Sequence, residues 1–227
     1  MVKMIITAGY KSVSTITQRK VIWDIDILTT YLRNSTVDET SVFAVSRQTA
    51  TLLLLCSGRR VHDLTLLATD SQHYSEENDS LILWPIFGSR TDTATFRQSG
   101  WRLHSNIESK NLDPVFWVKL CKTLLQERRQ QTGIPNLFLN IRGPPKAASR
   151  TLIAGWVKSL LTEAGVIATP GSLRSAVASK RWQNNCPLDD ILSGGNWRSK
   201  ATFTRFYCKE VMPRVSNGDV ISLFNSV

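Results

Sequence analysis

Hydrophobic residues recur along most of the chain at the spacing of helices that bury one side. Residues 21–35 (VIWDIDILTTYLRNS) are apolar at positions 22, 25, 27, 28 and 32, which predicts a helix. The segment 46–58 (SRQTATLLLLCSG) contains the longest apolar stretch of the chain, residues 49–56, which predicts a buried helix with Gly58 near its end. Further helices are predicted over residues 59–67, 113–133, 149–166, 169–185, 187–196 and 199–212.

One region has the pattern of strands instead. Residues 80–87 (SLILWPIF) predict a strand, residues 88–94 (GSRTDTA) a turn, and residues 95–105 a returning strand. The predicted fold class is therefore mainly α with a small antiparallel β-sheet (α+β). The predicted organisation is a lead-in over residues 1–20, one domain over 21–212 and a tail over 213–227.

The charge balance narrows the choice of partners. The chain holds 28 Lys and Arg against 18 Asp and Glu, a formal net charge of +10 among 227 residues. Such an excess favours a polyanion, with nucleic acid first and an anionic membrane surface second. No apolar stretch reaches the length of a membrane span, and the first residues lack the apolar run of a signal peptide, so we expect no membrane partner.

The cysteine and histidine residues form no ligand pattern. The four cysteines lie far apart, without a CxxC pair, and the three histidines have no metal-ligand spacing. We therefore expect reduced thiols in an intracellular compartment, no metal and no cofactor. The residues concerned are Cys56, Cys121, Cys186, Cys208, His62, His73 and His104.

Two arginines stand where an anion is easily bound. Arg60 follows Gly58 at the junction of two predicted helices, where a largely buried guanidinium needs an anion or several acceptors. Asp63, three residues later, can hold it, so an internal ion pair is the simpler alternative. Arg174 follows TPGSL at a predicted helix start, which suits a phosphate; a solvated surface arginine is the alternative there.

An aromatic pair near the end of the chain is embedded in positive charge. Trp197 and Tyr207 lie ten residues apart in GNWRSKATFTRFYCKE, with basic residues and no acid between them. Two core aromatics at near-helical spacing would be the ordinary explanation.

Taken in order, these segments resemble the tyrosine recombinase (phage-integrase) family. LLLLCSGRRVHDLTLL resembles the first-arginine motif, TPGSLRSAVAS the second-arginine motif, and GNWRSKATFTRFY the His/Trp motif followed by the nucleophilic tyrosine. The phrasing is most similar to the integrases of DIRS-like tyrosine-recombinase retrotransposons. The resemblance covers roughly residues 21–212.

The resemblance implies DNA strand cleavage and rejoining through a 3′-phosphotyrosyl intermediate, as in site-specific recombination or integration of a mobile element. Tyr207 would be the nucleophile, and Arg60 and Arg174 would neutralise the charge that develops on the phosphate. Trp197 would donate its indole N–H to the same phosphate. Neither a metal nor a cofactor is implied.

The chain departs from the family pattern at two positions. Arg90 stands in the predicted turn where the family carries a lysine that protonates the leaving oxygen; Lys110 and Lys146 are the alternatives. Gly171 stands where the family carries the histidine of His-x-x-Arg, next to Ser172, which can hydrogen-bond a phosphate. A catalytically impaired DNA-binding remnant of a recombinase is therefore the alternative function.

The implied partner is double-stranded DNA, contacted through its phosphates. The resemblance implies a homo-oligomer on DNA, a tetramer, and a place in the nucleus if the host is eukaryotic, otherwise in the cytoplasm or nucleoid. We also expect either that the N-terminal clamp domain of the family is missing from this chain or that the chain is a fragment or domesticated copy. An unrelated alternative is a helical protein-interaction domain whose charge is incidental. The residues predicted to grip DNA are Lys180, Arg181, Arg198, Lys200 and Arg205.

Overall fold

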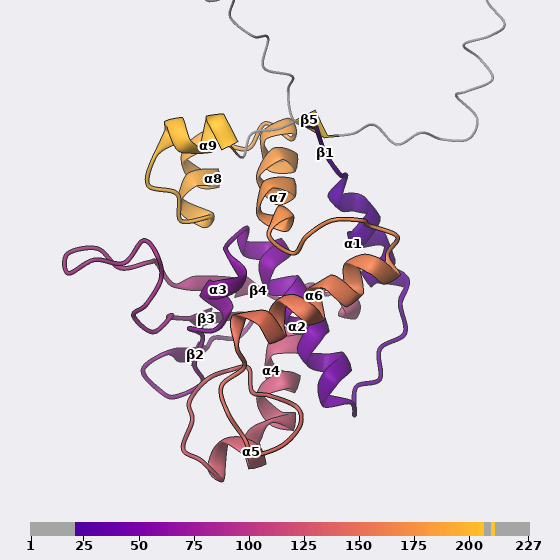
Figure 1. The fold of residues 1–227 in the computed structure, drawn as a ribbon, viewed down its shortest axis with the longest axis vertical. Coiled ribbons are helices and arrows are strands. Elements are labelled where there is room, and N and C mark those ends of the chain that lie inside the picture. The colour runs from indigo at the N-terminus through magenta and orange to yellow at the C-terminus, as the bar shows by residue number, and fades with distance from the viewer. Residues whose placement is uncertain (1–20, 207–209, 212–227) are drawn as a thin grey trace, which may run out of the picture.

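The computed structural model, which describes residues 21–206 and 210–211, is built around one apolar helix (Figure 1). This helix, α2 (Val42–Ser57), begins at Ser41, whose side chain accepts the N–H of Ala44. It ends at Gly58, whose φ of 62° is left-handed and whose N–H bonds the carbonyl of Leu54. The predicted buried helix is confirmed, with a start a few residues earlier than the apolar run indicated.

Helices α4 and α6 pack against α2 and close the main core around it. Each begins at a side-chain cap, Asp113 for α4 and Ser149 for α6. The predicted helix 113–133 divides at Leu125 into two helices. The helices besides α2 are α1 (Ile25–Asn34), α3 (Val61–Leu64), η1 (Lys110–Leu112), α4 (Pro114–Leu124), α5 (Gln126–Gln130), α6 (Arg150–Glu163), α7 (Ser172–Gln183), α8 (Leu188–Gly194) and α9 (Lys200–Phe206).

A three-stranded antiparallel sheet lies at the side of the helices, in the order β2 (Tyr74–Glu76), β3 (Ser80–Leu83), β4 (Trp101–His104). Its presence confirms the predicted fold class. The two predicted strands are much shorter than expected, however, and residues 84–100 form a long connection instead of a tight hairpin.

The side chain of Asp92 explains why that hairpin does not form. Its carboxylate accepts the backbone N–H groups of Gly88, Ser89 and Gln98 at 3.0 Å, so these donors do not pair across a ladder. Burial opposes ionisation of Asp92, but these three bonds outweigh it and lower the pKa of the carboxyl group.

The two ends of the described chain pair with each other, which the sequence did not predict. Strand β1 (Val21–Ile22) lies parallel to β5 (Glu210–Val211). Helix α1 therefore starts only at Ile25, after the cap Asp24, and the predicted helix over 199–212 was too long, because α9 ends at Phe206 in the described residues. Local periodicity carries no information about a pairing between such distant segments.

Helix α7 joins the C-terminal helices to the rest of the molecule. Its small buried residues let neighbouring helices approach on two sides. On one side Ala176 and Val177 pack with Ile22 and Ile25 of the N-terminal segment, and on the other Ala178 packs against α8 and α9. No helix within 21–206 is both long and apolar enough to cross a membrane.

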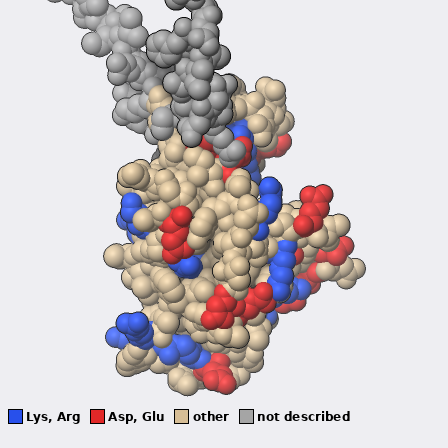
Figure 2. Space-filling view, turned by 90° about the vertical axis from the view of Figure 1, so that its right-hand side faces the viewer, with Lys and Arg blue, Asp and Glu red and all other residues tan. Residues whose placement is uncertain are grey.

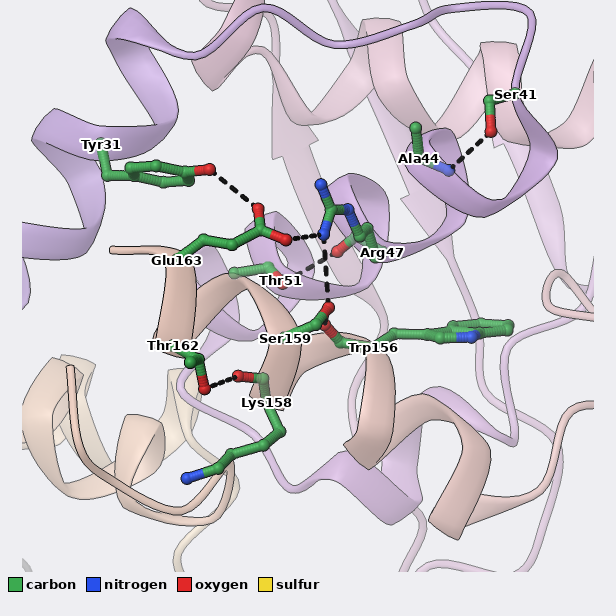
Figure 3. Close-up of polar contacts among 10 residues, drawn as sticks. All are labelled: Tyr31, Ser41, Ala44, Arg47, Thr51, Trp156, Lys158, Ser159, Thr162 and Glu163. Carbon is green, nitrogen blue, oxygen red and sulfur yellow. Dashed lines mark hydrogen bonds and ion pairs between the residues drawn. The ribbon is translucent and has the colours of Figure 1, made fainter. Parts of the chain in front are cut away.

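A polar cluster ties α1, α2 and α6 together at their exposed edge (Figure 3). The carboxylate of Glu163 accepts the hydroxyl of Tyr31 at 2.8 Å and pairs with Arg47, which also donates to Ser159. The hydrogen bond from Arg47 is the main cause that lowers the pKa of Glu163, and Tyr31 adds to it.

Replacing Glu163 with Gln should cost about 0.5 kcal/mol of unfolding free energy, since the pair is partly exposed. The folded-state pKa lies below the unfolded one, so this stability is present above the ordinary pKa of Glu and is lost as pH falls through the folded value. Urea unfolding of both proteins at several pH values measures this. A difference that grows on acidification would contradict the assignment.

Candidate functional site

Arg174 lies where two helices end. Its side chain is buried (4% exposed), and Nη1 donates to the carbonyls of Gly58 at 2.9 Å and Gly195 at 2.6 Å. Gly58 follows α2 and Gly195 follows α8, each as the C-terminal cap. Carbonyl groups at helix C-termini carry partial negative charge, so a guanidinium is stabilised there. One side chain thus brings together the segments that carry Arg60 and Trp197.

The Trp197 ring stacks on Arg174, with 3.8 Å from the guanidinium carbon to the ring centroid. The sequence GNW is what allows this. A Cβ on Gly195 would lie 1.6 Å from the Trp197 ring, and Asn196 has a φ of 55°, which asparagine tolerates better than most residues. The ring also makes an edge contact with Phe203 of α9, at 5.4 Å between centroids.

Arg60 stands directly before α3 and is partly buried. Its backbone N–H donates to Asp63, but no ion pair joins the two side chains. The simpler interpretation of the sequence, an internal ion pair between Arg60 and Asp63, is therefore wrong. Nη1 of Arg60 is buried and has no hydrogen-bond partner within residues 21–206, which is the situation that an anionic ligand would relieve.

A buried chain of hydrogen bonds holds the 84–100 connection to this region. Asp63 accepts the hydroxyl of Ser89 at 2.9 Å, Ser89 lies 3.2 Å from the hydroxyl of Thr91, and Thr91 accepts Asn196 Nδ2 at 2.6 Å. Arg90 lies between Ser89 and Thr91 in the chain, and its own side chain is exposed. Its backbone is thus fixed near α3 and Asn196, although the predicted hairpin tip does not exist.

Arg59 is the buried arginine that the sequence analysis missed. It is only 3% exposed and donates to Gly194 O at 3.1 Å and to Gln98 Oε1 and Ser99 Oγ at 2.8 Å. Its guanidinium stacks over Trp101, and burial lowers its pKa to about 10. The two adjacent arginines in GRR (58–60) could have indicated Arg59. The three-residue spacing between Arg60 and Asp63 favoured Arg60 instead.

The predicted supporting residues Gly171 and Ser172 lie at the start of α7. Gly171 is exposed, and a Cβ there would meet only the hydroxyl of Thr169, at 4.0 Å. The hydroxyl of Ser172 accepts the indole N–H of Trp23 at 2.8 Å and donates to the carbonyl of Thr169. Ser172 therefore links α7 to the segment before α1, and its contact with a phosphate stays a prediction.

The residues predicted to grip DNA have different surroundings. The amine of Lys180 lies 2.7 Å from Asp26 and 3.6 Å from Asp24, so its charge is compensated; the bond to Asp26 is the main reason that its pKa is raised. Arg198 is exposed and stacks over Phe96, and Lys200 is exposed. Arg181 donates to the carbonyl of Cys56. The side chain of Arg205 and all of Tyr207 lie outside the described residues.

The two alternatives to Arg90 are placed differently. Lys110 pairs with Glu39 and stacks over Phe116, while Lys146 is exposed. Neither contact joins them to Arg60, Arg174 or Trp197. On the face shown in Figure 2, basic and acidic side chains lie side by side, so that face is not a continuous basic surface.

Comparison with solved structures identifies the fold. The chain superposes on the XerH site-specific recombinase bound to difH substrate, in a pre-cleavage complex, with a TM-score of 0.59, 14% identity and 91% of this chain covered. For the XerA recombinase, the TM-score is 0.56, the sequence identity is 16%, and 92% of this chain is covered. This chain spans 54% and 64% of those chains, respectively. No protein-family model and no curated protein sequence matches. The fold is that of the tyrosine recombinase catalytic domain.

Replacing Gly195 with Ala should displace the Trp197 ring from Arg174, because the new methyl group would overlap the ring. We expect a loss of about 1–3 kcal/mol in unfolding free energy, as for other overpacked sites. Gly155→Ala is the matched control: it lies on the exposed side of α6 with open space around its Cβ and should stabilise by about 0.5–1 kcal/mol. Urea unfolding measures both. Equal stability of the two variants would refute the contact.

Proposed function

We propose that this chain cleaves and rejoins DNA strands through a 3′-phosphotyrosyl intermediate. The observation that carries the proposal is the position of Arg174, whose Nη1 joins the Gly58 and Gly195 carbonyls. This contact gathers the segments of Arg60, Arg174 and Trp197 around one point. The shared fold supports the proposal, because the solved XerH structure is described as a recombinase bound to its DNA substrate.

The nucleophile and the charge-stabilising groups of the reaction come from this chain. The Tyr207 hydroxyl attacks the phosphorus and loses its proton to water, a new P–O bond forms, and the bond to the 5′-oxygen breaks as that oxygen takes up a proton. Arg60 and Arg174 stabilise the extra negative charge on the non-bridging oxygens. In the reverse direction a 5′-hydroxyl attacks the phosphotyrosine, so the strand is rejoined without an external energy source.

At the two positions where the chain departs from the family pattern, it offers no good proton donor. The departing 5′-oxygen must gain a proton, and a guanidinium, the group that Arg90 offers, is in general a poor proton donor. Gly171 has no side chain that could act as acid or base. These two positions favour one alternative, a remnant that binds DNA and no longer cuts it.

The wider biological role rests on the resemblance of the motifs. We propose a mobile-element integrase, closest to those of DIRS-like retrotransposons, that acts on double-stranded DNA as a tetramer. In a eukaryotic host its place would be the nucleus. The activity and partners of a complete protein of this kind belong to the same proposal, since this chain spans 54% of the XerH chain.

The covalent intermediate provides the direct test. On nicked duplex DNA that releases a short fragment after cleavage, the wild-type chain should form a protein–DNA band that persists on a denaturing gel. Tyr207→Phe removes the nucleophilic oxygen and should abolish the band. Tyr31→Phe is the matched control, because the Tyr31 hydroxyl donates to Glu163 in the polar cluster of α1, α2 and α6.

Arg174→Gln should reduce trapping at least a hundredfold, as loss of a charge-stabilising donor does in other enzymes. Arg142→Gln, an exposed arginine on another loop, should leave trapping unchanged. If no band forms on a broad pool of sequences while binding stays sensitive to salt, the DNA-binding remnant replaces the enzyme.

Arg90→Lys should accelerate cleavage, because an ammonium group gives up a proton more readily than a guanidinium. The gain should reach roughly ten- to a hundredfold, within the range of general acid catalysis. It should vanish on a substrate whose 5′-oxygen is replaced by sulfur, since a thiolate leaves without a proton. Single-turnover trapping rates measure both. An equal gain on both substrates would exclude Arg90 as the position of the acid.

A further inference from the structure

A second basic site lies next to Gly194, one residue before Gly195, whose carbonyl accepts a hydrogen bond from Arg174. It is a hollow of about 460 Å³ where α2, α7, α8 and β4 meet. Three arginines and three serines line it, and no acidic residue does. These residues are Arg59, Arg102, Arg181, Ser57, Ser99 and Ser193.

Two of the arginines converge on one backbone position. Nε of Arg59 donates to the carbonyl of Gly194, and Nη1 of Arg181 would lie 3.0 Å from a Cβ placed on the same glycine. Arg181 also donates to the carbonyl of Cys56 in the last turn of α2. Neither arginine forms an ion pair with a carboxylate of residues 21–206. Arg102 differs, because it pairs with Glu77.

The helix ends do not balance this charge. The C-terminus of a helix carries about half a negative charge, so α2 and α8 together supply roughly one. Two guanidinium groups of the hollow, those of Arg59 and Arg181, donate to carbonyls at these ends. The nearby carboxylates of Asp63 and Asp92 act on Arg59 electrostatically but form no ion pair with it. Roughly one positive charge of the hollow therefore remains for a further anion.

Unused hydrogen-bond donors point to the kind of anion. Arg59 makes three hydrogen bonds, fewer than a guanidinium can donate. Ser99 accepts one of these bonds and keeps its own O–H for a ligand. Trp101 lines the hollow, is 3% exposed, and its indole N–H has no partner among the described residues. Several donors with no acceptor suit a phosphate group, which presents only oxygens.

We propose that this hollow binds a phosphate group other than the one assigned to Arg60 and Arg174. The carbonyls of consecutive residues, Gly194 and Gly195, are held by Arg59 and Arg174, so the two sites share one stretch of backbone as their wall. The phosphate comes either from the backbone of bound DNA, in which case the proposal deepens the proposed function, or from a free phosphate compound.

The first arm of the test uses pyrophosphate and the full chain. At constant ionic strength, pyrophosphate should raise the unfolding temperature in a saturable manner. Arg181→Gln, at the rim, should weaken this binding roughly tenfold, the effect of losing one charged hydrogen bond. Arg142→Gln, an exposed arginine away from the hollow, is the matched control and should not change it. Circular dichroism checks that both variants fold.

The second arm uses a short DNA duplex at several salt concentrations. If the phosphate belongs to DNA, Arg181→Gln should lower the slope of log affinity against log salt by about one, while Arg142→Gln leaves it unchanged. If Arg181→Gln weakens pyrophosphate binding but does not change the salt dependence of DNA binding, the hollow binds a free phosphate compound. If Arg181→Gln behaves like Arg142→Gln in both arms, the proposal is overturned. Trapping through Tyr207 is measured separately, so failure of either proposal leaves the other standing.

Discussion

The candidate site depends on the hydrogen bonds from Arg174 to the carbonyls of Gly58 and Gly195. They tie the C-terminal end of α2 to the consecutive helices α7 and α8, although Gly58 and Arg174 lie 116 residues apart in the chain. The bonds also explain why a buried guanidinium is stable there, since both carbonyls carry the negative end of a helix dipole. Loss of this side chain would therefore remove the contact that assembles the candidate site.

Positive charge in this region is arranged around backbone carbonyls more than around carboxylates. Arg59, Arg174 and Arg181 all donate to carbonyls at or near helix ends, and Asp63 accepts a backbone N–H and a hydroxyl instead of a guanidinium. Carbonyls hold the arginines in place but only partly offset their charge. Around Arg59 and Arg181, such an arrangement offsets less positive charge than full ion pairs with carboxylates would. Lys180, paired with two aspartates, is the contrasting case.

Much of the architecture followed from the sequence. The apolar run that became α2, the caps and glycines at helix ends and the strand pattern before residue 84 are local signals, and local signals suffice for helices that bury one side. The order of the motifs also indicated the fold, which the solved recombinase structures confirm. The sequence likewise marked Arg60, Arg174 and Trp197 as residues of interest, because the order of their motifs resembles that of the tyrosine recombinases.

Only the tertiary structure decided how those residues are used. The pairing of β1 with β5 and the burial of Arg59 depend on contacts between segments far apart in the chain, which periodicity does not encode. The long 84–100 connection depends on hydrogen bonds from backbone N–H groups to the Asp92 side chain, which periodicity does not encode either. The same holds for the absence of an Arg60–Asp63 ion pair. Sequence determined which chemical groups were present and which helices would carry them. Packing determined which backbone carbonyls the Arg174 guanidinium contacts, because that depends on where two helix ends converge.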